Sequence, residues 1–400
     1  MTADPDQESP MLAEEEGIPP GYWILTESRE FIGRVFSFLP AKTLNTCSRV
    51  CQVWRLEAGR ALSRREDIGW VTLGRKEAEE YVDSPTTPCV DDELGPFGVH
   101  LNTCLNSIGS VPRLAVVFSE CQHPSEFKTL QYDYERTPGT RKKTIKLIHS
   151  RLPTECQIVG LRVDGTIGCQ RDLSPAGESE GQMGSACVLL PEINFRRTCH
   201  SDGPRPDPLY RPDTKCFLVF TPRGLHNATA TVIRQLQHHM YTKHGRHPVI
   251  AGGIVKQVWI EPSPSRLKKP ECSILSFYGP HVNAASVVLG RTVTTRDEAR
   301  RKMLELKKAG LSEKRSLAFM FSCIGRGREL YDEPDVESEV FHELFPNTPL
   351  VGFFGGGEYG CENLTCGKVV KDMDDGGRAN GALQGLTQSL TCVVCLLSFG

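Results

Sequence analysis

The glycine-rich stretch GGGEYG at residues 355–360 formally matches the G-x-G-x-x-G fingerprint of dinucleotide-binding proteins. In that fingerprint a helix follows the glycines, and its N-terminus meets the pyrophosphate. Here the next residues are CENLTCGKVV, which include Asn, Thr, two cysteines and a glycine and predict a return to strand. We therefore interpret the motif as a tight turn at a strand end, where glycine accommodates positive φ.

Two clusters of cysteine and histidine have spacings that occur in metal sites. CVVC at residues 392–395 has metal or redox spacing, but a structural zinc site needs four ligands, and Cys361 and Cys366 do not supply a matching pair. Core cysteines are the simpler interpretation. The histidines either bind a metal or form the polar ends of a surface helix; they are His238, His239, His244 and His247. We favour the second alternative and predict no metal and no cofactor.

The sequence contains no G-x-S-x-G, H-E-x-x-H or P-loop motif. With 16 cysteines and 11 histidines, no Cys/His or Ser/His pair stands out as a nucleophile and its base. We predict no catalytic residues.

A binding surface is predicted where the apolar strand SLAFMFSC ends at Cys323. If this strand neighbours LVGFF, both glycine-rich ends open on one side of the sheet, and ligands often bind at the carboxyl ends of strands. Arg326 would then make the Cys323 thiol more nucleophilic; the alternative is a packed strand-end cysteine with an inert sulfur. The predicted substrate- or ligand-binding residues are Cys323, Gly325, Arg326, Gly327, Gly355, Gly356, Gly357 and Glu358.

Length and composition limit the classes of protein that fit. A chain of 400 residues with 39% hydrophobic and 24% charged residues is typical of a globular protein of several domains. The net charge of -2 gives no basic excess for nucleic-acid binding. The first 28 residues lack Lys and Arg, which argues against a secretory signal, and no apolar run approaches the roughly 18 residues of a membrane span. We expect a cytoplasmic and nuclear protein without a membrane partner, whose cysteines are free thiols.

The elements near the N-terminus are predicted to be helices. Ser28 can cap a helix with apolar residues at 31, 32, 35, 36 and 39, and Pro40 ends it. A second short helix carries Leu44 and Cys47, and a third runs from Val53 into a basic turn at 60–65. Three short helices bury little apolar surface by themselves, so we expect a partner to cover the rest.

Beyond residue 70, short β-branched runs alternate with loops and a few helices. The predicted fold class is α+β, with sheets covered by helices. The sequence also suggests two distantly duplicated halves that meet near residue 265. The predicted strands are 113–119, 156–163, 186–195, 215–220, 248–253, 272–278, 285–290, 316–323, 350–354, 366–371 and 391–397. The predicted helices begin at Asn227, at the capping box Thr295-x-x-Glu298 and at Pro334, and residues 171–185 are predicted to be a loop.

The stretch FLPAKTLNTCSRVCQVWR resembles the F-box, the three-helix module by which substrate receptors bind a Skp-type adaptor. The usual opening Leu-Pro of that family is replaced by Thr26-Glu27-Ser28. The resemblance implies that the apolar surface of the module is an interface. It assigns adaptor binding to Phe36, Leu39, Pro40, Leu44, Val50, Cys51 and Trp54.

The remainder resembles the FIST domains, through PVIAGG in an N-terminal half and FMFSCIGRG and PLVGFFGGGEYG in a C-terminal half. The predicted organisation is an acidic disordered tail at 1–21, an F-box at 22–70, a FIST N-terminal domain at 71–262 and a FIST C-terminal domain at 271–400. This combination implies a non-catalytic substrate-recognition subunit of an SCF-type E3 ubiquitin ligase, with the Skp-type adaptor, a cullin and a RING protein as partners and protein substrates sent for proteasomal degradation. The alternative is a small-molecule sensor or a scaffold that uses the FIST region as a ligand-binding module.

Overall fold

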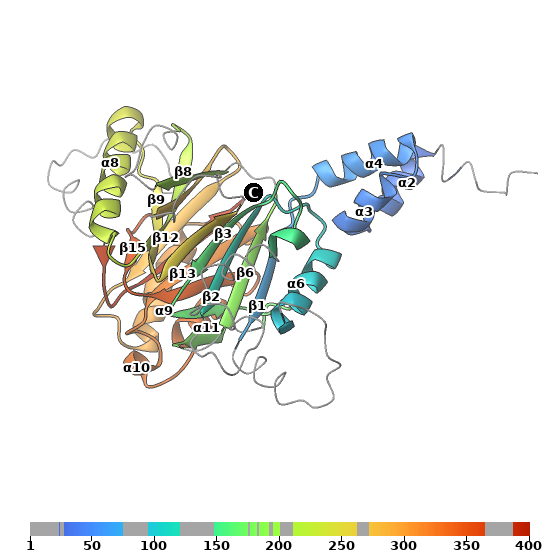
Figure 1. Cartoon of the computed structure of the whole chain (residues 1–400). Helices are drawn as coiled ribbons and strands as arrows, with labels where there is room; N and C mark the ends of the chain where they lie inside the picture. Colours follow the sequence, from blue (N-terminus) through green and yellow to red (C-terminus); the bar gives the residue numbers. More distant parts are fainter. Residues whose placement is uncertain are drawn as a thin grey trace, which may run out of the picture. The chain divides into compact units, whose positions relative to one another are not determined.

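A computed structural model describes residues 24, 28–74, 95–120, 148–174, 177–181, 184–191, 195–200, 211–261, 272–364 and 387–400. The chain divides into two compact units, residues 1–65 and 66–400, and each is treated by itself (Figure 1). The predicted acidic tail at 1–21 and the predicted strand at 366–371 lie outside the described residues, and of the predicted domain boundary at 261–271 only Glu261 is described.

In residues 28–65, the continuous described part of the first unit, three helices pack together, as predicted. Its helices are α2 (Arg29–Phe36), α3 (Ala41–Cys47) and α4 (Gln52–Ser63). Ile32, Phe36, Leu44 and Ala58 form its small core, and the rings of Phe36 and Trp54 meet edge to face at 5.3 Å between centroids.

The described residues of the second unit form three sheets, each built around a pair of parallel strands. Sheet 1 has the order β1 (Gly69–Leu73), β6 (Gly184–Leu190), β2 (Leu114–Glu120), β3 (Gln157–Arg162) and β10 (Gln257–Glu261). Sheet 2 has the order β7 (Phe195–His200), β11 (Cys272–Tyr278), β8 (Thr214–Pro222), β9 (Val249–Val255), β15 (Glu358–Gly360) and β16 (Thr387–Gln388). Sheet 3 has the order β12 (Asn283–Leu289), β17 (Cys392–Ser398), β13 (Ser316–Cys323), β14 (Leu350–Gly355), β4 (Gly165–Gly168) and β5 (Gly177–Glu180). The parallel pairs are β2/β3, β8/β9 and β13/β14, and the other pairings are antiparallel.

The three sheets repeat one connectivity, in cyclic order. After its second parallel strand the chain enters the neighbouring sheet: β4 pairs with β14, β10 with β3, and β15 with β9. It then returns to pair antiparallel with its own first parallel strand, as β6 with β2, β11 with β8, and β17 with β13. The structure therefore shows three topological repeats, at about 69–190, 195–278 and 283–398, where the sequence suggested two halves.

Each repeat completes the sheet of another, so strands from both sides of residues 262–271 share sheets 2 and 3. The assignment of 71–262 and 271–400 to separate domains stays a prediction. Sequence analysis does not detect the three repeats because they share only the order of their hydrogen-bonded strands. The apolar runs that form those strands have no common sequence motif.

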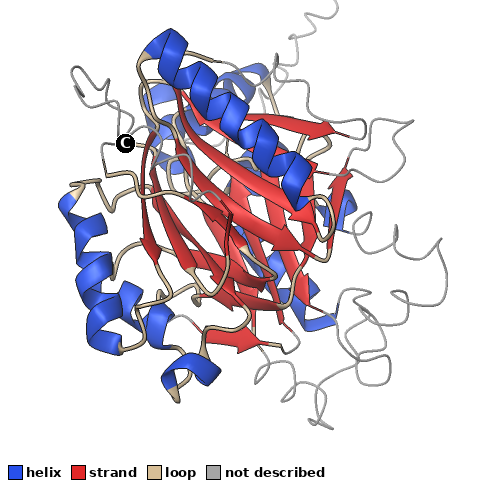
Figure 2. Cartoon of the chain, turned by 90° about the vertical axis from the view of Figure 1, so that its left-hand side faces the viewer, coloured by secondary structure: helices blue, strands red, loops and turns tan. Residues whose placement is uncertain are grey.

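Buried side chains from all three sheets form one core, and helices cover the outer faces (Figure 2). The core includes Phe118 of sheet 1, Phe220 of sheet 2, and Phe319, Phe321 and Phe353 of sheet 3. Outside, α6 (Gly95–Ser107) packs on sheet 1, α8 (His226–His244) on sheet 2, and α9 (Arg296–Lys308) and α11 (Val336–Leu344) on sheet 3. The α+β prediction is confirmed.

Local signals predict some elements well and miss others. The capping box of Thr295 and Glu298 starts α9, and Gly245 ends α8 at φ 60°, both as predicted. The prediction of a loop at 171–185 was wrong, because it contains the short strand β5. That strand lies at the edge of sheet 3, where polar residues are usual. The strands β1, β4 and β10 and the helix α6 were not predicted.

Candidate functional site

The helix α2 carries two apolar stripes that face in different directions. Ile32 and Phe36 point into the module's core and are 2% exposed. Phe31 and Val35, four residues apart on α2, share another side of the helix and are 45% and 39% exposed, and Phe38, in the turn that follows α2, is 83% exposed. An apolar stripe this exposed on so small a module marks an interaction surface.

The residues predicted to bind the adaptor divide into three groups. Phe36 and Leu44 are buried in the module's own core. Leu39, Pro40, Cys51 and Trp54 are half-buried, and Val50 is 63% exposed. Adaptor contact by these residues stays a prediction. Sequence reasoning missed the outward stripe because it counted Phe31 and Val35 with the inward residues.

Polar contacts hold the turns of the module. Pro40 takes the N-cap position of α3, and Cys51 takes that of α4, where its Sγ accepts a hydrogen bond from the Trp54 amide at 3.5 Å. The guanidinium of Arg65 donates to the carbonyl oxygens of Phe36 and Ser37, at 2.7 and 2.8 Å, and to that of Leu39. These contacts satisfy carbonyls at the end of α2, which no helix bond can pair.

In the second unit, β13 and β14 are parallel neighbours, as the predicted binding surface requires. Cys323 stands opposite Gly355, so the two glycine-rich strand ends lie at the same edge of sheet 3. The Cys323 side chain is 8% exposed. The amide of Ile324 donates to the carbonyl of Gly355 at 3.0 Å, which ties the two loops together.

Arg326 is buried beneath this edge, only 1% exposed, and its donors are engaged within the chain. Its guanidinium forms an ion pair with Glu337 at 2.6 Å and donates to the Tyr331 hydroxyl at 2.8 Å. It also donates to three backbone carbonyls, those of Gly290, Val293 and Leu390. Arg326 therefore joins three loops to α11, and the ligand role predicted for it stays a prediction.

Leu390 lies over the start of the Cys323 loop and has a strained backbone. Its φ is 58°, unusual for a non-glycine residue, and its side chain is 46% exposed. A Cβ added at Gly325 would lie 2.8 Å from the Leu390 Cδ2 atom. Glycine at 325 thus permits Leu390 to cover the loop with an exposed apolar side chain.

Glu358 is a buried acid at the start of β15, 1% exposed. Its Oε2 accepts a hydrogen bond from the Thr391 hydroxyl at 2.6 Å, while its Oε1 has no partner among the described residues. Burial raises the pKa of Glu358 to about 8. Gly357, which precedes it, has φ 141°, so a turn with positive φ occurs here as predicted.

The edge strand β5 adds two more carboxylates to the same region. Glu178 accepts a hydrogen bond from the Ser338 amide in the first turn of α11 at 2.9 Å, and burial raises its pKa to about 8. Glu180 accepts from the Arg328 amide at 2.9 Å and lies against Gly327. Both carboxyl groups thus accept hydrogen bonds from first-turn amides, which have no partner within their own helix.

The structure also describes the surroundings of the CVVC cysteines and of the histidines in and after α8. Cys392 and Cys395 are fully buried in β17, as the core interpretation expects, and burial raises the pKa of Cys392. On α8 the ring of Tyr241 stacks on that of His247 at 4.7 Å. In the part of the chain that the structure describes, no three Cys, His, Asp or Glu side chains are grouped as metal ligands. No helix within the described ranges is long and apolar enough to span a membrane.

Comparison with known proteins finds a domain family and two distant relatives. Residues 268–361 match the FIST C domain. The chain contains a FIST C domain. It is also 26% identical over 372 residues to F-box only protein 22 of Homo sapiens and of Pongo abelii, with 88% of this chain and 89% of each relative covered. This is a distant homology.

A solved structure, cyanuric acid hydrolase from A. caulinodans, aligns with 84% of this chain and 99% of its own, at 8% identity and a TM-score of 0.35. A likeness this weak carries no argument about function.

Proposed function

We propose that the chain is a non-catalytic substrate receptor of an SCF-type E3 ubiquitin ligase. Its helical module binds the Skp-type adaptor, which connects it to a cullin and a RING protein, and its sheet unit captures the proteins to be ubiquitinated and degraded. The distant homology to F-box only protein 22 spans both units and supports this assignment at the level of the family.

The observation that carries the proposal is the exposed apolar side chains of Phe31 and Val35 on α2 and of Phe38 in the turn after it. The module has its own core, so these side chains are not needed for its packing. Val50, also exposed, precedes α4. Large apolar anchors of this kind dominate the energy of interfaces when a partner covers them.

Substrate capture is assigned to the strand ends around Cys323 and Gly355–Gly357. There the glycine loops and the exposed Leu390 lie at a rigid sheet edge, with Cys323, 8% exposed, at the end of β13. Binding residues commonly lie on loops that a rigid scaffold holds in place.

The test is co-purification of a Skp-type adaptor with the full chain and with Phe38→Ser. We expect the variant to lose adaptor binding at least tenfold, since an interface anchor commonly contributes about 2 kcal/mol or more. Leu304→Ser, which changes an exposed leucine of the sheet unit, is the matched control and should bind as the wild type does. Equal adaptor recovery with all three proteins would contradict the proposal.

The Leu39→Ala, Pro40→Ala double variant tests the F-box pattern itself. Both side chains are half-buried at the turn into α3, so we again expect at least a tenfold loss of adaptor binding, with the sheet unit still folded. Retention of adaptor by this variant and by Phe38→Ser together would exclude the helical module as the adaptor-binding element.

A further inference from the structure

The helix α8, which covers sheet 2, and the segments on either side of it contain no acidic residue. Between Asp213 and Glu261 the sequence has no Asp or Glu, although the whole chain has 49 acidic and 47 basic residues. The Lys and Arg residues of this segment are Lys215, Arg223, Arg234, Lys243, Arg246 and Lys256, and its histidines are His226, His238, His239, His244 and His247. Only carboxylates from other parts of the chain can offset its positive charge.

The outer side of α8 presents hydrogen-bond donors along its length. The inner side buries apolar residues such as Leu236 and Met240 against sheet 2. The exposed residues of the outer side are spaced three or four apart, as one face of a helix requires. They are Asn227, Thr231, Arg234, His238, Tyr241 and Thr242, which we name the α8 face. Every one of these side chains can donate a hydrogen bond, and none is negatively charged at neutral pH.

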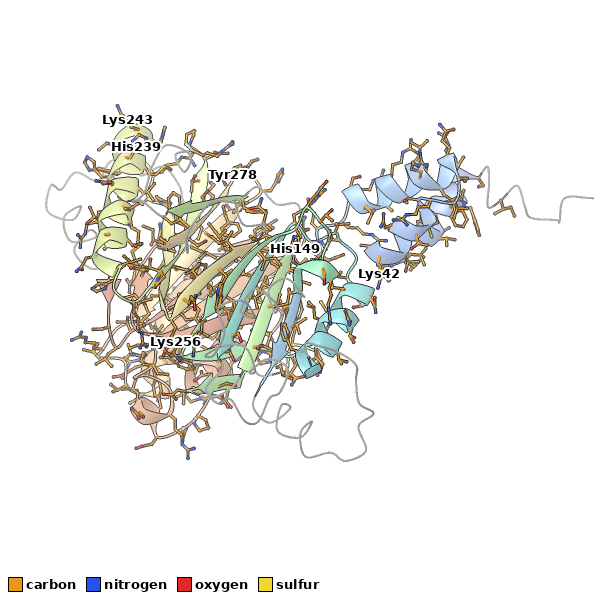
Figure 3. All side chains as sticks on the ribbon, in the orientation of Figure 1. Lys42, His149, His239, Lys243, Lys256 and Tyr278 are labelled. Atoms are coloured by element: carbon orange, nitrogen blue, oxygen red, sulfur yellow. The ribbon has the colours of Figure 1, made fainter. Side chains whose placement is uncertain are left out.

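Positive charge on and next to this face is not cancelled within the described residues. Of that part of the chain, no residue forms a hydrogen bond or an ion pair with the side chains of Arg234, Lys243 or Arg246. Glu362, which closely follows β15 of sheet 2, pairs instead with Lys302 of α9. Figure 3 shows Lys243 near the end of α8, at the periphery of the sheet unit.

The stability of α8 does not explain its composition. A cation in the last turn, such as Lys243, offsets the negative end of the helix dipole, but Arg234 lies in the middle of the helix. The first turn of α8 has no acid, and its N-cap Leu225 makes no side-chain hydrogen bond. Acids in the first turn and pairs of opposite charge one turn apart would stabilise an exposed helix.

The helix α9 of sheet 3 has the features that α8 lacks. It begins with a capping box and has two acids in its first turn. Its Arg296 and Arg300 form ion pairs with acids of α11, and its Lys302 pairs with Glu305 of the same helix. The two outer helices therefore differ in charge balance, and α8 alone of this pair keeps a positive outer surface.

The residue types of the α8 face favour a peptide over other anionic partners. A helix that binds a membrane surface inserts apolar side chains, whereas the large aliphatic residues of α8 are buried. Nucleic acid is held by many Lys and Arg contacts to phosphates, but this face has one arginine among amide and hydroxyl groups. Those groups and a guanidinium donate well to carboxylates, and Tyr241, 37% exposed, is of a type enriched in protein interfaces.

We propose that the α8 face binds an acidic segment of a protein, rich in Asp and Glu, with Arg234 and Lys243 as its charged contacts. The inference rests on the proposed function, in which the sheet unit captures protein substrates. It names the chemistry of one recognised segment and adds a contact surface apart from the strand ends around Cys323.

The test measures the binding of fluorescein-labelled decaglutamate to the full chain by fluorescence anisotropy, over about 1 to 500 μM protein. We expect the wild type to bind this peptide and not the labelled decaglutamine of the same length. The Arg234→Gln, Lys243→Gln double variant should bind decaglutamate at least about fivefold more weakly, because two exposed ion pairs are lost. Glutamine is a good helix former, so α8 should stay folded, which circular dichroism checks.

The Arg301→Gln, Lys308→Gln double variant is the matched control. It removes the same two charges, from exposed positions in the middle and in the last turn of α9. It should bind decaglutamate as the wild type does. Failure of the wild type to bind decaglutamate would overturn the proposal, and so would equal weakening in this control, which would indicate an effect of net charge alone.

Other anionic probes test the choice of partner. If vesicles containing phosphatidylserine, or a duplex oligonucleotide, bind more tightly than decaglutamate and with the same dependence on Arg234 and Lys243, the proposal of an acidic peptide is overturned. Adaptor co-purification distinguishes this inference from the proposed function. The α8 double variant should retain the adaptor, whereas a wild type that binds decaglutamate without recovering adaptor would contradict the ligase assignment alone.

Discussion

The two units of this chain differ in which residue types they expose and which they bury. The helical module buries a core of four apolar residues and leaves large apolar side chains such as Phe38 outside. The sheet unit surrounds an extensive apolar core and buries a pair of charged groups beside it, Arg326 and Glu337. Exposed apolar surface indicates an absent partner, whereas buried charge indicates that the partner is already within the fold.

The largest expected effect in the sheet unit comes from Arg326→Met. It would leave Glu337 buried without its cation and three loop carbonyls without a donor, so we expect the free energy of unfolding to fall by roughly 3–5 kcal/mol. Arg296→Met is the control, because Arg296 pairs with Glu339 and Glu343 on an exposed surface and should cost about 1 kcal/mol or less. Denaturant unfolding measures both, and similar losses would show that burial does not make the Arg326 contacts more important to stability than an exposed ion pair.

The second effect distinguishes the buried apolar residues of the module from the exposed ones. Leu44→Ala creates a cavity in a fully buried position and should destabilise the module by about 2–5 kcal/mol, so that adaptor binding is lost through unfolding. Phe38→Ser should lose the adaptor while the helical circular dichroism and the unfolding midpoint of the module change little. A comparable loss of helix in both variants would mean that the exposed apolar residues support folding.

Local elements of the fold can be predicted from the sequence. The long-range contacts of buried charged residues and the direction of the α2 side chains cannot, for physical reasons. The apolar runs of β13 and β14, the capping box at Thr295 and the αL glycine at 245 are local signals, and the structure confirms them. The buried partners of Arg326 come from residues 290, 293, 337 and 390, which no local pattern relates. On α2, periodicity detects apolar positions but does not state which of two adjacent stripes meets the core.

The third effect is a pH dependence of the sheet unit. Burial raises the folded-state pKa of Glu358 and Glu178 to about 8, above the ordinary value of 4.5. The folded state therefore binds more protons than the unfolded state between these values. The stability contributed by each protonated carboxyl is complete below pH 4.5 and is lost as pH rises toward 8, by at most about 1.4 kcal/mol per pH unit per group.

Glu358→Gln should abolish its share of this dependence, because the amide remains neutral. From pH 6 to pH 8 we expect the variant to gain stability relative to the wild type, as measured by denaturant unfolding at each pH. Glu333→Gln, which changes an exposed carboxylate near α11, is the control and should follow the wild-type curve. A constant difference between Glu358→Gln and wild type across this range would show that Glu358 is already ionised in the fold.

The smallest expected effect concerns access to cysteine sulfur. Cys47 and Cys51 in the module are half-buried, Cys323 is 8% exposed, and Cys392 and Cys395 are fully buried. Alkylation of native protein by limiting iodoacetamide should follow that order, because a thiol must reach solvent to react. Arg326 is committed to Glu337, so we expect access, rather than a free guanidinium, to set the rate at Cys323. Peptide mapping after brief treatment measures the order. Labelling of Cys323 ahead of Cys392 and Cys395, with loss of substrate binding and retention of the adaptor, would place recognition at the end of β13. If Cys323 stays protected until the sheet unit unfolds, the strand end is packed shut and substrate capture must be sought elsewhere on the sheets.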